Sequence, residues 1–126
     1  GEIDVLEHVG FDEGHIVSSV HNIAHHGDLS NSDQTKHIVV DDVISTFKNY
    51  ILEWDEKQIK TFVDDKLIFS YSKNNQPWER WPFDEKFRFI LNIAIGGNWG
   101  GIKGVDDNAF PTKMEIEHFR VYKKKP

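Results

Sequence analysis

Residues 1–7 read Gly-Glu-Ile-Asp-Val-Leu-Glu, a short apolar segment that carries three carboxylates. Its apolar residues are typical of a buried β-strand, in which unpaired acids are costly. Glu2 and Asp4 are two residues apart and share one strand face, but Glu7 would point to the other face of a regular strand. A β-bulge at Val5-Leu6, which inserts one residue, returns Glu7 to the side of the other two acids.

Three carboxylates on one strand face fit the chemistry of a retaining glycosidase. Such an enzyme places two carboxyl groups about 5–5.5 Å apart, one ionised as the nucleophile and the other protonated as the acid/base. Three crowded acids cannot all ionise at low cost, so their pKa values should spread and leave a proton on one group near neutral pH. The alternative is an acidic, solvated edge strand, because short acidic patterns recur by chance.

The rest of the chain predicts strands and turns. Short segments rich in β-branched and aromatic residues are separated by turn residues, and no segment sustains a helical period over three turns. We therefore predict an all-β fold of antiparallel strands in two packed sheets. The predicted strands are 16–21, 38–43, 47–54, 58–63, 67–71, 87–95 and 114–122. The polar stretch 23–36 is interpreted as a mobile loop rather than as a metal site at His25, His26 and Asp28.

Composition narrows the classes of function. The 126 residues allow one domain, and 38% of them are hydrophobic and 13% aromatic, which is enough for a core. The net charge of −6 argues against nucleic acid as a partner, since the basic run Lys123-Lys124-Lys125 is a terminal tail. No apolar run is long enough to span a bilayer, so no membrane partner is expected. The absence of cysteine excludes disulfides and leaves the compartment open.

The motif at residues 2–7 resembles the E-x-D-x-x-E signature of glycoside hydrolase family 16, in its bulged, laminarinase-like form. Other segments agree with the family in order and spacing, and the resemblance covers nearly the whole chain. They are Ser-Val-His at 19–21, Asn-Tyr-Ile-Leu-Glu-Trp at 49–54, Ile-Lys-Thr-Phe-Val-Asp at 59–64, Trp-Pro-Phe-Asp at 81–84, Leu-Asn-Ile-Ala-Ile-Gly-Gly-Asn-Trp-Gly-Gly at 91–101, and the closing segment 110–122. The resemblance implies a jelly-roll β-sandwich, concanavalin A-like, and an endo-acting hydrolase of β-1,3-glucan that retains configuration.

The resemblance also implies roles for single residues. Glu2 matches the nucleophile, Glu7 the acid/base, and Asp4 the neighbour that tunes and orients Glu2. His21 matches a histidine beside the catalytic acids, so it is counted among the substrate-binding residues. Its imidazole is expected to hydrogen-bond the acid/base carboxyl, Glu7, and to help set its protonation. The alternative for His21 is a histidine half-buried at a strand end.

A substrate platform is predicted in the glycine cluster at 96–101. Glycines let the backbone turn sharply there, so Asn98 and Trp99 are predicted to contact substrate, with a sugar ring stacked on the indole. Glycine clusters also occur wherever strands simply turn. Trp78 and Trp81 are weaker candidates for a sugar contact, and Trp54 is expected to pack in the core.

A structural cation is a further implication of the resemblance. Many members of the family bind calcium on the convex side through an aspartate of the last strand, and Glu117 occupies that position. The longer carboxylate weakens this expectation, since calcium takes six to eight oxygen ligands, and no complete site can be named. No organic cofactor is implied.

Members of the family are considerably longer, and their catalytic strand lies near the middle of the chain. Residues 1–126 are therefore expected to be the C-terminal half of a glycoside hydrolase jelly-roll domain, starting at the catalytic strand. The expected partners are β-glucan and either a complementary N-terminal chain or a second copy of this chain. A secreted or periplasmic location, or one on the outer surface, follows from the family and its polymeric substrate.

Three alternative functions remain at this point. The first is a hydrolase of mixed-linkage glucan or of a marine galactan, which uses the same fold and the same acids. The second is a non-catalytic glucan-binding module, which the presence of all three acids disfavours. The third is an inactive half-sandwich fragment.

Overall fold

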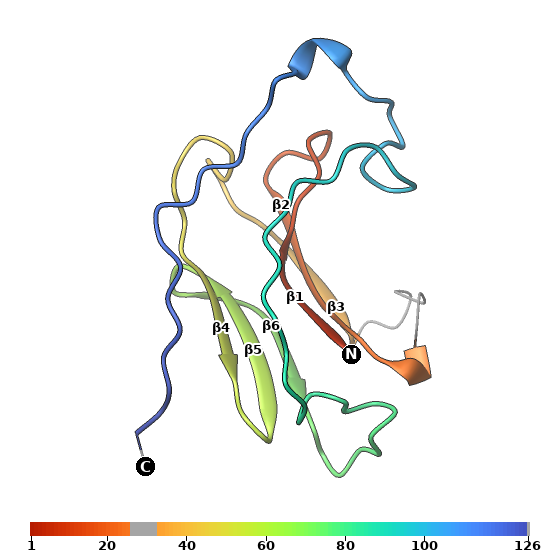
Figure 1. The fold of residues 1–126 in the computed structure, drawn as a ribbon, viewed down its shortest axis with the longest axis vertical. Helices are drawn as coiled ribbons and strands as arrows, with labels where there is room; N and C mark the ends of the chain where they lie inside the picture. Colours follow the sequence, from red (N-terminus) through yellow and green to blue (C-terminus); the bar gives the residue numbers. More distant parts are fainter. Residues whose placement is uncertain (26–32, 126) are drawn as a thin grey trace. The chain divides into compact units, whose positions relative to one another are not determined.

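The computed structural model describes residues 1–25 and 33–125. By its internal contacts the chain divides into two compact units, Gly1–Phe89 and Ile90–Pro126. The described residues of the first unit form six β-strands in two antiparallel sheets, coloured red to green in Figure 1. These sheets carry the candidate site.

The first sheet contains β1 (Glu2–Glu7), β2 (His15–His21) and β3 (Thr35–Val39), with β2 in the centre. Side chains on β2 alternate between two faces. Ile16 and Val20 are completely buried against the second sheet, whereas His21 belongs to the opposite face. A 3₁₀ turn, η1 (Ile23–His25), follows β2 directly.

The second sheet contains β4 (Tyr50–Trp54), β5 (Gln58–Val63) and β6 (Lys66–Ser72), with β5 in the centre. Tight turns join these strands. In the first turn the carboxylate of Asp55 accepts the backbone N–H groups of Lys57 and Gln58 at 2.7 and 2.9 Å. Short polar side chains satisfy the turn backbone in this way, which explains why the strand pattern is interrupted there.

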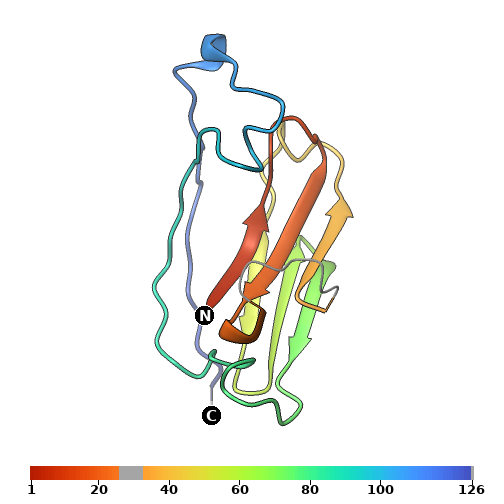
Figure 2. The ribbon, with the colours of Figure 1, turned by 90° about the vertical axis from the view of Figure 1, so that its right-hand side faces the viewer.

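The core lies between the two sheets, which Figures 1 and 2 show as two layers. Tyr71 stacks on Trp81 with ring centroids 5.7 Å apart, and Trp81 meets Phe83 edge to face at 5.3 Å. Burying each large apolar side chain stabilises the fold by about 1.5–3 kcal/mol. The buried apolar residues are Ile16, Val20, Ile59, Val63, Ile68, Phe69, Tyr71, Trp81 and Phe83.

Five of the seven predicted strands are present: the strand over 58–63 has its predicted bounds, and the other four have shifted ends. The strand predicted over 38–43 starts earlier, at Thr35, and stops at Val39. It stops because residues 41–45 form a turn in which Asp42 adopts a left-handed φ of 59° and its carbonyl accepts the N–H groups of Ser45 and Thr46.

The strands predicted over 87–95 and 114–122 are not formed among the described residues. Their composition suits a strand, but a strand also needs a neighbour that pairs with its backbone groups. Their apolar side chains are largely exposed, as shown by Ile90 at 67% and Val121 at 68%. The sequence prediction was therefore wrong for both segments.

The second unit contains one short 3₁₀ helix in its described part, η2 (Asp107–Ala109), capped by the Asp106 carboxylate. Its glycine cluster forms a turn in which Gly97 has a φ of 80° and its carbonyl accepts the N–H of Gly101 at 3.1 Å. A Cβ atom on Gly101 would lie 2.7 Å from that carbonyl oxygen, so this turn requires glycine. Across the described residues of both units, no helix has the length and apolar character needed to cross a bilayer.

Candidate active site

The predicted bulge is present in β1. Asp4 lies opposite Ser19 of β2 and Glu7 lies opposite Val17, so three steps along β1 match two steps along β2. One residue of β1 is therefore extra, and Glu7 returns to the strand face that carries Asp4. The bulge that spacing alone predicted is confirmed.

Ser19 joins two of the carboxylates directly. Its Oγ atom lies 3.2 Å from Oδ2 of Asp4 and 3.4 Å from Oε2 of Glu7, and the residue is completely buried. A hydroxyl has one proton to donate, so Ser19 can donate a hydrogen bond to one carboxylate while it accepts a hydrogen bond from the other carboxyl group, if that group is protonated. Ser19 therefore suits a pair of carboxyl groups that share one proton.

Ser19 was not predicted to act in the site. The available signal was its spacing from His21, because residues two apart on a strand point to the same face. That signal is useful only once β2 is known to pair with β1, and the register of this pairing was not known from the sequence.

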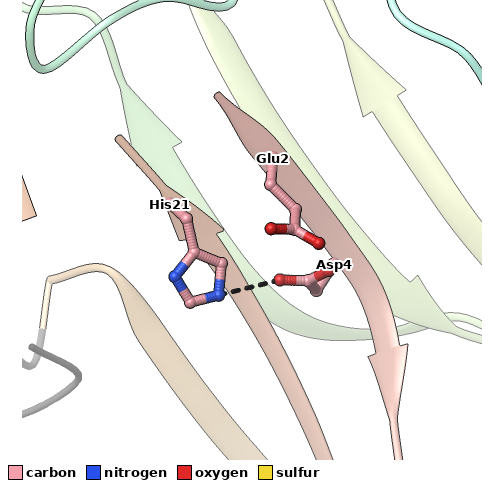
Figure 3. Close-up of side chains that lie close together, drawn as sticks. All are labelled: Glu2, Asp4 and His21. Atoms are coloured by element: carbon pink, nitrogen blue, oxygen red, sulfur yellow. Dashed lines mark ion pairs between the residues drawn. The ribbon is translucent and has the colours of Figure 1, made fainter. Parts of the chain in front are cut away.

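His21 and Glu2 complete the cluster. The Nε2 atom of His21 lies 3.0 Å from Oδ2 of Asp4, and Glu2 lies directly opposite His21 in the strand pairing. Ligand-type atoms of Glu2, Asp4 and His21 all lie within 4.8 Å of one another. Figure 3 shows Glu2 and Asp4 projecting from β1 towards the imidazole on β2. The structure thus brings together four residues that the sequence singled out, Glu2, Asp4, Glu7 and His21.

Burial controls the electrostatics of this cluster. It is the main reason why the pKa of the Asp4 carboxyl is raised, and the negative charge of Glu2 raises it further. Burial likewise raises the pKa of the Glu7 carboxyl, with a second contribution from the charge of Asp4. His21 and Ser19 oppose both shifts by stabilising the ionised forms. The pKa values of Asp4 and Glu7 are therefore shifted in the same direction, and the predicted spread among the three acids stays a prediction.

The arrangement divides the carboxyl groups by environment. Glu2 is exposed at the start of β1, whereas Asp4 and Glu7 are partly buried. An exposed carboxylate beside a carboxyl group with a raised pKa offers a nucleophile and a proton donor on one surface. Among the described residues, one group of three or more acids and histidines lies close enough to share a metal ion. It consists of Glu2, Asp4 and His21.

The predicted substrate platform lies in the second unit. Asn98 and Trp99 belong to the turn formed by the glycine cluster, and the indole of Trp99 is 42% exposed. The exposure leaves a face on which a sugar could stack. Because each unit is described by itself, contact of Asn98 and Trp99 with a substrate at Glu2 stays a prediction.

The other tryptophans differ in burial. Trp81 is 2% exposed and its indole N–H donates to Asp84 at 3.1 Å, so it belongs to the core rather than to a sugar site. Trp78 is exposed. Trp54, expected in the core, is instead 38% exposed and meets Phe87 edge to face at 5.1 Å. It lies on β4, an outer strand of its sheet, where a side chain can be covered on only part of its surface.

The calcium ligands implied by the resemblance are not assembled at Glu117. Its side chain is exposed, and Oε2 lies 3.7 Å from Nδ1 of His118. In the described part of the chain no group of three or more acids and histidines forms around it. Calcium takes six to eight oxygen ligands, so these residues do not fit it by themselves, and calcium there stays a prediction. Of the weaker metal alternative, His26 and Asp28 lie outside the described residues.

The sequence and the fold of this chain are both similar to those of known proteins. The family model for glycosyl hydrolases family 16 matches residues 1–118. A β-glucanase of Rhodothermus marinus is 38% identical over 98% of this chain, which spans 44% of that relative's length. The structure of the laminarinase from Rhodothermus marinus superposes with a TM-score of 0.80 at 38% identity, covering 86% of this chain and 45% of that one. The laminarinase from Flavobacterium sp. UMI-01 superposes with a TM-score of 0.77 at 37% identity, with the same two coverages.

These similarities confirm the predicted fold class, an antiparallel β-sandwich of the jelly-roll type, although the chain spans less than half the length of the relatives it matches. The matched segment begins with the carboxylate cluster and runs through both units. The chain belongs to glycosyl hydrolases family 16.

Proposed function

We propose that this chain carries the catalytic acids of an endo-acting hydrolase that cleaves internal β-1,3 linkages of a laminarin-type glucan with retention of configuration. One observation carries the proposal: Glu2, Asp4 and Glu7 share a face of β1, with Asp4 bonded to His21 and with Ser19 contacting both Asp4 and Glu7. Relatives named β-glucanase and laminarinase support the substrate class.

The reaction divides between two carboxyl groups. The Glu2 carboxylate attacks the anomeric carbon and forms a glycosyl ester, while the protonated Glu7 gives its proton to the departing glycosidic oxygen. Glu7, now ionised, takes a proton from water, and the resulting hydroxide displaces Glu2 from the anomeric carbon. The raised pKa of Glu7 suits its first step, because the shift favours the protonated form of the group that must donate a proton.

Asp4 works through its neighbours in this proposal. Its carboxyl group lies between Glu2, His21 and Ser19, so its charge acts on Glu2 from one side and on Glu7 from the other. Asp4 therefore helps to keep one proton in the cluster and to hold Glu2 in place for attack. It makes no bond to the sugar.

Reaction stereochemistry tests this proposal. The full-length protein should release reducing ends from laminarin, and proton NMR should show the β-anomer as the first product. Mixed-linkage glucan and a galactan such as agarose serve as competing substrates. Release of the α-anomer first, or turnover of the galactan alone, would overturn the proposal.

We further propose that residues 1–126 act with additional polypeptide, either a complementary N-terminal chain or a second copy of this chain. The length of the relatives and the exposed apolar side chains of both units support this. A polymeric substrate would be met outside the cytoplasm, so we propose a secreted or periplasmic location, or one on the outer surface.

A further inference from the structure

Two hydrogen bonds in series, the first buried and the second partly buried, cross the sandwich from β5 to the bulge in β1. The Thr61 hydroxyl donates to Oγ of Ser18 at 2.8 Å, and the Ser18 hydroxyl donates to the backbone carbonyl of Asp4 at 2.7 Å. Thr61 and Ser18 are both completely buried. Each hydroxyl has a single proton, so this direction of donation uses both protons, and the two bonds strengthen each other.

These two hydrogen bonds form a relay from Thr61 through Ser18 to the Asp4 carbonyl. The relay ends where the strand pairing changes. Asp4 is the last residue of β1 in register before the shift that separates it from Glu7. An extra residue disrupts the ladder of backbone hydrogen bonds between β1 and β2 locally. A hydrogen-bond donor from outside the ladder therefore stabilises a backbone carbonyl at this point. Ser18 supplies that donor from the core side of β2.

Asp4 is consequently held from two sides by adjacent residues. Ser18 faces the core and bonds the Asp4 backbone, whereas Ser19 faces the cluster and contacts the Asp4 carboxylate. His21 contacts the same carboxylate from the same face as Ser19. A shift of the bulge would therefore move Asp4 and Glu7 together relative to Glu2.

An apolar pair could occupy the place of these two hydroxyls. Burying a hydroxyl between two sheets is costly unless it is bonded, and replacing both partners of a buried bond by apolar groups of the same shape can leave stability nearly unchanged. Packing alone therefore does not explain the choice of Ser18 and Thr61. Fixing the Asp4 carbonyl does explain it.

We infer that Ser18 and Thr61 are positioning residues of the proposed hydrolase, because their relay fixes the bulge that presents Glu7 on the same side as Glu2. The inference rests on the proposed function. Neither residue needs to reach the sugar, since both act through the backbone of Asp4.

The test uses the full-length protein with Thr61→Val, Ser18→Ala and the double variant. We expect each single change to lower kcat by about 10- to 100-fold with KM changed less than about twofold, since small misplacements of reacting groups have effects of this size. The double variant should be no slower than the slower single variant, because both changes break one relay. Thr61→Ser keeps the hydroxyl and should restore turnover. Ser70→Ala, at an exposed hydroxyl on β6, is the matched control.

A second readout separates positioning from stability and does not need activity. Carbon-13 NMR titration of the Asp4 and Glu7 carboxyl groups should differ between Thr61→Val and the parent, because their spacing sets their coupling. If the parent itself hydrolyses no glucan, the proposed function is wrong. The titration still shows whether the relay positions Asp4 and Glu7. A Thr61→Val or Ser18→Ala protein that melts earlier but keeps the parent's kcat and carboxyl titrations would overturn the inference. Each variant breaks the relay independently, so either one that folds is sufficient.

Discussion

The imidazole Nε2 of His21 lies 3.0 Å from a carboxylate oxygen of Asp4, across the pairing of β1 with β2. This contact places a side chain that can carry positive charge beside three acids. It opposes the raised pKa values of both Asp4 and Glu7, although the carboxylate that it pairs with is that of Asp4 and not, as predicted, that of the acid/base Glu7. The proton affinities of the cluster therefore depend on a residue that makes no bond to the sugar in the proposed reaction.

Replacing His21 by alanine should raise the pKa of Asp4 and of Glu7 further. The reason is that both ionised forms lose a favourable charge, and Asp4 also loses a hydrogen bond. The pH–rate profile should move to higher pH, and carboxyl titration by NMR should show the same direction. His37→Ala, at an exposed histidine of β3, is the control. Equal shifts in both variants would contradict a specific role of His21.

Glu2→Gln and Glu7→Gln should each lower kcat in the full-length protein by at least about 100-fold, because each removes a group that forms a bond or transfers a proton. Azide should partly rescue Glu2→Ala and yield a product of inverted configuration, since the small anion can replace the nucleophile. Glu56→Gln, at an exposed turn residue, is the matched control. Near-normal turnover in either glutamine variant would end the catalytic assignment.

The sequence predicted the bulge because the signal was local. The spacing of Glu2, Asp4 and Glu7 within one apolar segment requires an inserted residue if the acids share a face, and the observed register has one. The role of Ser19 could not be found in this way. It depends on which residue of β2 lies opposite Asp4, and that register is set by packing between segments distant in the sequence.

The two strands predicted in 87–95 and 114–122 failed for a related reason. Apolar, β-branched composition reports that a segment suits a pleated surface, but it does not report whether a pairing partner is present. The strand predicted over 38–43 extended too far for a different reason. The observed β3 ends at Val39, because Asp42 adopts a left-handed backbone conformation in the turn that follows. The two aspartates within this predicted strand, Asp41 and Asp42, are too weak a signal for the end of a strand.

Stability should depend on the protonation of Glu7. Its pKa is higher in the folded chain than in the unfolded chain, so the folded state binds its proton more tightly. The resulting stabilisation is fully present below the unfolded pKa and is lost as pH rises through the folded pKa. Thermal unfolding should show that Glu7→Gln is more stable than the parent at neutral pH. This difference should shrink as the pH falls to about 4, the pKa range of an ordinary carboxyl group. A gain independent of pH, or one matched by Glu56→Gln, would contradict this origin.

Deleting Leu6 should straighten β1 without turning Glu7 away. Two residues between Asp4 and Glu7 become one, which is the spacing that keeps both on one face of a regular strand. Deleting Ile3 is the matched control, because it separates Glu2 and Asp4 onto opposite faces. Crystal structures of the two deletions should show Glu7 beside Asp4 in the first and Glu2 turned away in the second. Glu7 on the far face after deletion of Leu6 would refute the register proposed for the bulge.

Residues 1–126 expressed alone should self-associate and hydrolyse little laminarin. In the described sheets β1 and β4 are outer strands, and outer strands present unpaired backbone groups to solvent. Large apolar side chains are also exposed in both units, including Ile51 on β4 and Ile90 and Tyr122 in the second unit. Apolar surface of this kind drives association with whatever covers it.

Size-exclusion chromatography with light scattering, run beside a reducing-sugar assay, measures both parts of this expectation. Adding a polypeptide that corresponds to the N-terminal part of the longer relatives should shift the elution to a defined complex and raise activity, because it supplies partners for the outer strands. A protein unrelated to these relatives, added at the same concentration, is the control. A monodisperse, active monomer of residues 1–126 would show that the sandwich needs no further chain, and the proposal of a complementary partner would then be wrong.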